Sequence, residues 1–341
     1  MRIPDPLREL GIDAAVAWSI PLTTRFRRIT RRDGVLLRGP QGWAEFSPFW
    51  DYDAPESAAW LRAAVADATT PRPAPLREQV EVNATIPVLA PALAHRIARV
   101  GGARTAKVKV ADPTSTLAED VARIEGVRDA LGPGGRIRID ANAAWDLEQA
   151  LHALPQLDAA ADGLEYAEQP CAAIEDLAAL RRALDIPIAA DESVRRAEDP
   201  LRVARAEAAD VLVMKVQPLG WVQRCLDLAA EAGLPVVISS AVETSIGLSA
   251  GIAAAAALPQ LPYACGLATA TLLTDDLVAD PLHAVDGALP VRRPAPDSDL
   301  LTRHAASAEL TRAWQDRLAA CTAILTGTHE PSSTEVADFP S

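Results

Sequence analysis

The chain has 341 residues, 49% of them hydrophobic and 4% aromatic, with a formal net charge of −13 and a sequence pI near 4.9. This length allows one large domain with a smaller one. The negative charge argues against nucleic acid or an anionic membrane as a partner, but not against a small anionic substrate in a local basic pocket. The four cysteines form no CxxC pair, we read no signal-peptide pattern, and the apolar run 247–258 is too short for a bilayer. We therefore expect a cytoplasmic protein without disulfides; the oligomeric state is not readable from the sequence.

The first 80 residues are predicted to form a small α+β domain. Residues 13–49 have the pattern of short strands, separated by turns at Asp33-Gly34 and Gly39-Pro40, and residues 55–68 have the pattern of a helix. An extended segment and a helix recur between residues 285 and 325. The polar tail 326–341 is predicted to be disordered.

From residue 81 onward, short apolar runs alternate with helical patterns. The eight runs are 81–88, 105–110, 136–142, 163–170, 186–193, 210–216, 234–240 and 263–269. Such alternation is typical of parallel βαβ units, and eight of them predict a (β/α)₈-type barrel over residues 81–284. A doubly wound open sheet is the alternative, which the absence of a glycine-rich dinucleotide-binding motif disfavours.

Charged residues stand at the ends of five successive predicted strands: Lys107 and Lys109, then Asp140, Glu168, Asp191 and Lys215. In a parallel barrel these ends meet at one mouth, where three converging carboxylates are costly unless a cation lies among them. Oxygen ligands without histidine or cysteine favour Mg²⁺ over Zn²⁺. The sequence therefore predicts a magnesium site with amines on both sides of it.

Each residue also has an ordinary structural explanation. Asp140, Asn142 or Asp191 could cap a following helix, and Lys215 could extend to solvent. The pair Lys107 and Lys109 points to one face of a strand, which could be a solvated face. These explanations weaken when taken together, because the strands of a parallel barrel are buried on both faces.

An amine beside a divalent ion suits the removal of a proton α to a carboxylate. A lysine can take that proton only when it is neutral, so its pKa must fall from about 10.4. Lys107 lies about 7 Å along the strand from Lys109, and its charge would help to lower the pKa of Lys109 or would hold an anionic part of the substrate.

The ordered motifs K-x-K, D-x-N, E-Q-P and D-E-S, followed by a later lysine, resemble the muconate lactonizing subgroup of the enolase superfamily. The segments GWAEFSPF (42–49), VEVNATIPV (80–88) and VISSAVETSIGL (237–248) look like further elements of that family. The resemblance implies an N-terminal α+β capping domain (1–80, completed by parts of 285–325) on a barrel catalytic domain (81–284). It also implies Mg²⁺, with Mn²⁺ as a substitute, bound by Asp140, Glu168 and Asp191.

The resemblance further implies a hydro-lyase of menaquinone biosynthesis, which dehydrates 2-succinyl-6-hydroxy-2,4-cyclohexadiene-1-carboxylate to o-succinylbenzoate via an enediolate. Lys109 would be the base and then the acid, and Lys215 would stabilise the enediolate from the opposite face. The residues expected to surround the substrate or the ligands are Lys107, Asn142, Ser239, Ser240 and Gly266.

Other functions stay open at this point. An N-succinylamino acid racemase, or another enzyme of the subgroup, would use the same two lysines. A Schiff-base aldolase acting through Lys215 would leave the three acids unexplained, and a non-catalytic barrel would not need them. A dipeptide epimerase is disfavoured because 265–269 (CGLAT) lacks an aspartate. The capping-loop residues Arg25, Arg27 and Arg28 could meet the succinyl carboxylate.

Overall fold

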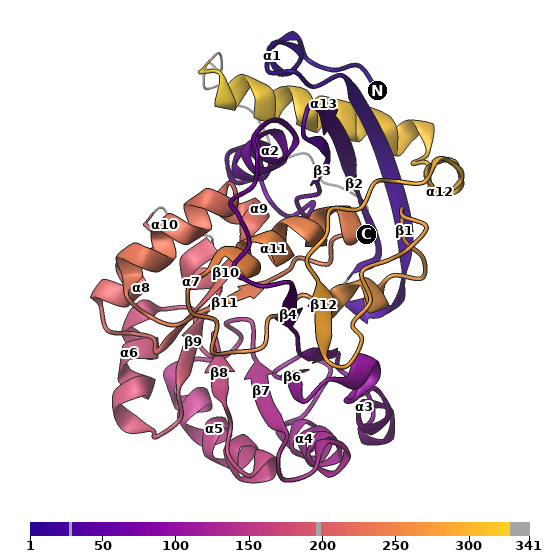
Figure 1. The fold of residues 1–341 in the computed structure, drawn as a ribbon. Helices are drawn as coiled ribbons and strands as arrows, with labels where there is room; N and C mark the ends of the chain where they lie inside the picture. The colour runs from indigo at the N-terminus through magenta and orange to yellow at the C-terminus, as the bar shows by residue number, and fades with distance from the viewer. Residues whose placement is uncertain (27–28, 196–198, 328–341) are drawn as a thin grey trace.

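The computed structural model describes residues 1–26, 29–195 and 199–327 (Figure 1). Among these residues, the N-terminal part forms a three-stranded antiparallel sheet in the order β1-β2-β3, with the bounds β1 (Ala14–Phe26), β2 (Ile29–Gly39) and β3 (Gly42–Phe46). The helices beside it are α1 (Asp5–Glu9), α2 (Ala54–Thr69), α12 (Ser298–Arg303) and α13 (Ala308–Leu325). Segments from both ends of the chain therefore build this part together (Figure 1).

The turn that we expected at Asp33-Gly34 is wrong. Both residues lie inside β2, where Gly34 pairs with Trp18 of β1. Glycine is needed there for close packing, because a Cβ atom at position 34 would lie 2.6 Å from the Cβ of Ser47. The other expected turn, at Gly39-Pro40, does connect β2 to β3.

The barrel is a curled parallel sheet. Within the described ranges it has seven strands in the order β11-β10-β9-β8-β7-β6-β5, and all neighbouring pairs are parallel. Their bounds are β5 (Ala84–Ile86), β6 (Thr105–Lys109), β7 (Arg136–Asp140), β8 (Tyr166–Glu168), β9 (Ile188–Ala190), β10 (Val211–Lys215) and β11 (Val236–Ser239).

The sheet closes through an irregular segment rather than through a full eighth strand over 263–269. Cys265 pairs with Val82 beside β5, and Gly266 pairs with Ser239 at the end of β11. A side chain at position 266 would not fit, because its Cβ would lie 2.6 Å from Ser239 Oγ. The 3₁₀ helix η2 (Ala268–Leu272) follows. The (β/α)₈-type barrel is confirmed, and the open sheet is excluded by this closure.

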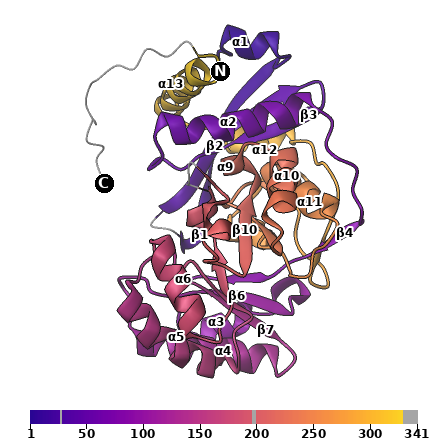
Figure 2. The same ribbon diagram turned by 90° about the vertical axis from the view of Figure 1, so that its left-hand side faces the viewer.

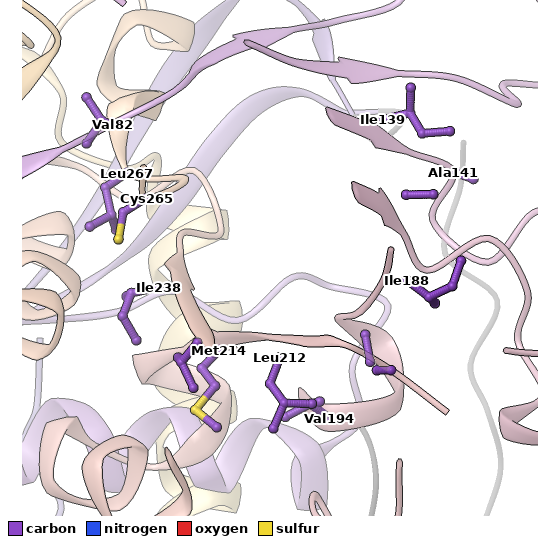
Figure 3. Packing of buried hydrophobic residues seen from close by; sticks show 14 of the residues in the cluster. Val82, Ile139, Ala141, Ile188, Val194, Leu212, Met214, Ile238, Cys265 and Leu267 are labelled. Atoms are coloured by element: carbon purple, nitrogen blue, oxygen red, sulfur yellow. The ribbon is translucent and has the colours of Figure 1, made fainter. Parts of the chain in front are cut away.

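Helices surround the barrel, and the pleat of the strands explains why. Apolar side chains of alternate positions point outward, as Leu212 and Met214 do along β10 (Figure 3), and they form one large buried cluster with the helices. The helices are α3 (Pro91–Ile97), η1 (Val100–Gly102), α4 (Leu117–Leu131), α5 (Leu147–Ala161), α6 (Ile174–Ala183), α7 (Glu192–Arg195), α8 (Arg202–Arg205), α9 (Val216–Leu219), α10 (Val222–Ala232) and α11 (Ser245–Ala257).

A second buried cluster lies between the N-terminal sheet, α2 and α13, where Phe46 and Trp314 meet edge to face at 5.6 Å. Figure 2 shows this cap above the barrel helices α4 and α5. The antiparallel pair β4 (Gln79–Glu81) and β12 (Ala288–Pro290) lies where the chain leaves and re-enters the cap. The boundaries 1–80 and 81–284 stay a prediction, and the predicted tail lies outside the described residues from 328 onward.

The four cysteines, all within the described ranges, are buried free thiols, as expected. In the same part of the chain, no helix combines the length and the apolar character needed to cross a membrane.

Candidate active site

Parallel pairing brings the predicted residues to one mouth of the barrel. Lys109 at the end of β6 is level with Asp140 at the end of β7, and Asp140 is level with Glu168 at the end of β8. Asp191 follows β9 directly, and Lys215 ends β10. The strands β6 and β10 are four positions apart in a barrel of eight positions, so Lys109 and Lys215 approach the mouth from opposite sides.

The structure excludes most of the ordinary explanations of these residues, although Asp191 does directly precede helix α7. Helix α5 is capped by Asp146, so neither Asp140 nor Asn142 serves as its cap. Asp140 is 1% exposed, and Lys107 and Lys215 are each 6% exposed. Burying such charges is costly, and it is tolerated because each has a partner of opposite sign.

Lys107 bridges two of the acids. Its Nζ donates to Asp140 Oδ2 at 2.9 Å and to Glu168 Oε1 at 2.6 Å. Burial lowers the pKa of Lys107, but the charges of Asp140 and Glu168 outweigh this and hold the pKa well above its ordinary value. Lys107 is therefore a fixed cation rather than a proton acceptor.

Lys109 is the more accessible amine. Its Nζ donates to Asp140 Oδ2 at 2.5 Å and to Asn142 Oδ1 at 2.8 Å, and it lies 5.5 Å from the centre of the Phe26 ring of the cap. Burial raises the pKa of Asp140, but Lys107 and Lys109 together hold it well below its ordinary value. The Asp140 carboxylate is thus ionised beside an amine that faces the cavity.

Lys215 contacts Asp191 at the end of the neighbouring strand, with Nζ 2.5 Å from Asp191 Oδ2. Burial lowers the pKa of Lys215; the Asp191 charge opposes this, and the nearby Arg195 guanidinium adds to the lowering. Lys107, Lys109 and Lys215 are also the only three lysines in the sequence. This scarcity is a signal that we did not use in the sequence analysis, and it ties every lysine of the chain to one cavity.

The three acids are the residues of the mouth that could hold a divalent metal ion. Within the described ranges, no group of His, Cys, Asp and Glu side chains is already arranged to hold a metal ion. Lys107 and Lys215 contact the carboxylates instead. Glu168 Oε2, however, is buried without a hydrogen-bond partner among the described residues. Burial, and then the charge of Asp140, raise the pKa of Glu168 to about 7, so a further cation is needed to keep it ionised. Hard oxygen donors with one unsatisfied atom fit an ion of the Mg²⁺ type.

Two neighbouring cavities lie at this mouth. The smaller, about 30 Å³, is lined by all three lysines, by Asp140 and Asp191, and by the predicted residues Asn142, Ser239, Ser240 and Gly266. Ser240 Oγ donates to Gly266 O at 2.8 Å. The larger, about 730 Å³, lies between the mouth and the cap and shares Phe26, Lys109 and Asn142 with the smaller one. Arg25 lines it, whereas Arg27 and Arg28 lie outside the described residues.

Gln169 is a residue of the site that the sequence analysis overlooked, although it stands inside the E-Q-P motif. Its Oε1 accepts from the backbone N–H of Asp191 at 2.9 Å and of Ser193 at 3.1 Å, and its Nε2 donates to Ser193 Oγ at 2.7 Å. Gln169 therefore fixes the backbone that presents Asp191. Arg195 was also missed, although its spacing of four residues from Asp191 on a short helix was visible.

Comparisons with known families agree with this arrangement. The family model described as "Enolase C-terminal domain-like" matches residues 90–296, and that described as "Enolase N-terminal domain-like" matches residues 17–68. Together with three acids and flanking lysines at a barrel mouth, these matches define a protein of the enolase superfamily class, whose members generally use a divalent metal ion.

The curated relatives narrow this class. The chain is 57% identical over 308 residues to the o-succinylbenzoate synthase of Thermobifida fusca, covering 90% of this chain and 95% of the relative. It is 51% identical over 309 residues to that of Mycolicibacterium smegmatis, covering 90% and 94%. The chain therefore belongs to the o-succinylbenzoate synthase family of the enolase superfamily.

Solved structures share the fold at lower identity. The muconate lactonizing enzyme of Pseudomonas fluorescens superposes with a TM-score of 0.71 at 21% identity, covering 87% of this chain and 99% of that one. The L-Ala-D/L-Glu epimerase of Bacillus subtilis gives 0.71 at 21% identity, covering 84% and 97%.

Proposed function

We propose that this protein is a hydro-lyase that dehydrates 2-succinyl-6-hydroxy-2,4-cyclohexadiene-1-carboxylate to o-succinylbenzoate in menaquinone biosynthesis. The names of relatives at 46–57% identity over at least 90% of the chain support this reaction. The single structural observation that carries it is the pair Lys109 and Lys215 on opposite sides of a carboxylate-lined mouth.

In the proposed mechanism Lys109 acts as base and then as acid. Its neutral amine takes the proton α to the substrate carboxylate and becomes an ammonium group. It then gives that proton to the departing hydroxyl, so that water leaves, the ring becomes aromatic and the amine is neutral again. Lys215 stays on the opposite face, where an ammonium group stabilises the negative charge that develops on the substrate.

We propose that Asp140, Glu168 and Asp191 hold Mg²⁺, with Mn²⁺ as a possible substitute. A bound divalent ion would neutralise the charge that develops on the substrate carboxylate when its α-proton leaves. Lys107 would remain a fixed cation behind the acids, because its raised pKa keeps it protonated. Asn142 would orient Lys109 through its hydrogen bond at 2.8 Å.

The remaining proposed contacts concern the succinyl group. Ser239, Ser240 and Gly266 line the cavity on the side of Lys215 and would meet it there. We also propose a cytoplasmic location, with a small anionic substrate as the partner and no nucleic acid or membrane, supported by the free thiols and the net charge of −13.

A racemase of N-succinylamino acids is the second candidate, because amines on opposite faces can also remove and return a proton at one carbon. The deciding experiment gives the purified protein Mg²⁺ and the diene substrate, and follows the aromatic product by its ultraviolet absorbance. A parallel reaction follows the optical rotation of an N-succinylamino acid. Formation of o-succinylbenzoate supports the proposal; racemisation without dehydration would replace it.

A further inference from the structure

A buried arginine connects the cap to one of the proposed metal ligands. Arg195 is 7% exposed, and its Nε donates to Asp191 Oδ1 at 3.0 Å. Its Nη2 donates to Glu192 Oε1, and its Nη1 donates to the hydroxyl of Tyr52. Tyr52 follows β3 in the cap, so one guanidinium group joins the two parts of the molecule.

The cap end of this connection is held firmly. The Tyr52 ring packs against Phe49 and Trp60, with ring centres 5.9 and 5.8 Å away. Its carbonyl oxygen accepts from Arg317 Nη2 of α13 at 2.6 Å. The hydroxyl that Arg195 contacts therefore has a position set by the packing of the cap.

The barrel end determines how Asp191 is presented. Arg195 holds Oδ1 of the carboxylate, while Oδ2 lies 2.5 Å from Lys215 Nζ in the mouth. Because a carboxylate is planar, fixing one oxygen fixes the direction of the other. The guanidinium fork suits this task, since its donors are held in one rigid plane, whereas a lysine ammonium is a compact charge on a flexible stem.

We infer that Arg195 is a positioning residue that orients Asp191 for metal binding, and that Tyr52 makes this orientation depend on the seating of the cap. The inference rests on the metal site of the proposed function. It gives the cap a role in metal affinity in addition to covering the cavity.

The test measures metal affinity without substrate or turnover. Mn²⁺ is titrated into metal-free protein and the free ion is followed by electron paramagnetic resonance, and Mg²⁺ binding is followed by calorimetry. Arg195→Met should weaken both affinities by about 10- to 100-fold, the usual cost of losing a partner behind a ligand. Arg195→Lys should give an intermediate loss, and Tyr52→Phe should give a smaller loss in the same direction.

Arg72→Met is the matched control. Arg72 also forms a partly buried pair with an aspartate, Asp67 of α2, at 2.6 Å, and it also joins cap to barrel through Ser249 of α11 at 2.9 Å, but it contacts no residue of the mouth. It should lower the melting temperature and leave both metal affinities unchanged.

Unchanged affinity in Arg195→Met would overturn the inference. If Arg195→Met does not fold, the test rests on Tyr52→Phe and Arg195→Lys. Wild-type metal affinity in both of these variants would also overturn the inference. The variants could show the expected order of metal affinities while the wild-type protein fails to dehydrate the diene. That outcome would refute the proposed reaction and leave this inference standing. Wild-type protein that binds no divalent ion would refute the metal assignment and this inference together.

Discussion

The barrel mouth and the contact between cap and barrel both bury charges, but they balance them differently. In the mouth, three lysines face the carboxylates Asp140, Glu168 and Asp191, and each acid has an ammonium partner. The interface network, which we define as Arg32, Glu45, Ser47, Gln217, Glu243 and Thr244, holds two carboxylates against one guanidinium.

Within the described ranges, hydrogen bonds join the members of the interface network. Glu45 of β3 accepts from Ser47 Oγ at 2.7 Å and from Thr244 Oγ1 at 2.5 Å. Arg32 of β2 donates from Nε to the carbonyl of Ala241, a residue that lines the small cavity. Burial, and then the charge of Glu243, raise the pKa of Glu45 to about 7. The mouth therefore pairs its buried acids with ammonium groups, whereas the interface network holds a buried carboxyl group whose pKa lies close to neutral pH.

The largest effect should follow from Lys109→Ala. We expect kcat to fall by about 10³-fold, because the acid–base group is lost, while the melting temperature stays near that of the wild type. Ser47→Ala in the interface network should behave in the opposite way, with reduced stability and a kcat close to wild type. Turnover and thermal unfolding measured on both variants check this, and a fully active Lys109→Ala protein would contradict the assigned base.

The next largest effect should come from removing the metal ion, which should affect the barrel mouth and not the interface network. Treatment with EDTA should abolish turnover, and added Mg²⁺ should restore it. Glu168→Gln should weaken Mg²⁺ binding by more than about 10-fold. The substitution removes the negative charge of the carboxylate whose Oε2 has no hydrogen-bond partner among the described residues. Glu45→Gln, the same change in the interface network, should retain wild-type affinity in calorimetry. An equal loss of Mg²⁺ affinity in Glu168→Gln and Glu45→Gln would contradict the assignment of metal binding to the mouth alone.

The pH dependence of stability should identify the interface. The pKa of Glu45 is about 7 in the folded chain against an ordinary value of 4.5. The folded state therefore binds the Glu45 proton more tightly than the unfolded state does. This tighter binding adds to the free energy of unfolding; the contribution is fully present below pH 4.5 and is lost as pH rises through 7. The loss is about 3 kcal/mol at 1.36 kcal/mol per pH unit.

Glu45→Gln removes that proton and should flatten this part of the curve. Urea unfolding at pH 5 and at pH 8 gives the free energy of unfolding of wild type and variant. Relative to the wild type, the variant should be more stable at pH 8 than it is at pH 5. If the variant and the wild type differ in stability by the same amount at both pH values, Glu45 is not the source of the pH dependence.

The smallest effect concerns the packing of the cap. Gly34→Ala would place a Cβ 2.6 Å from Ser47, and overpacking of this kind costs about 1–3 kcal/mol. Gly134→Ala is the control, since nothing lies within 4 Å of the Cβ that it would add. Thermal unfolding should show a lower melting temperature for the first variant and little change for the second.

The sequence predicted the mouth better than the interface, for a physical reason. Strand alternation and the position of Asp140, Glu168 and Asp191 at strand ends are local patterns, and parallel pairing then brings them together. The contacts of Arg195 with Tyr52 and of Glu45 with Thr244 join residues far apart in the chain, and no local pattern encodes them.

The errors in the fold have the same origin. Asp33-Gly34 has the composition of a turn, but close packing against Ser47 requires the glycine inside a strand. The segment 263–269 has the composition of a strand, but within this segment, as the structure describes it, only Cys265 and Gly266 pair with strands, and Gly266 lies too close to Ser239 for a side chain. In both places a tertiary contact overrides a local preference.

The confinement of lysine to the mouth has a practical consequence. Apart from the amino terminus, every primary amine of the chain belongs to Lys107, Lys109 or Lys215. Reductive methylation with isotopically labelled formaldehyde would thus place spectroscopic reporters in the cavity without any engineering. Nuclear magnetic resonance could then follow the protonation of the labelled amines, with the amino terminus as the one other site of labelling.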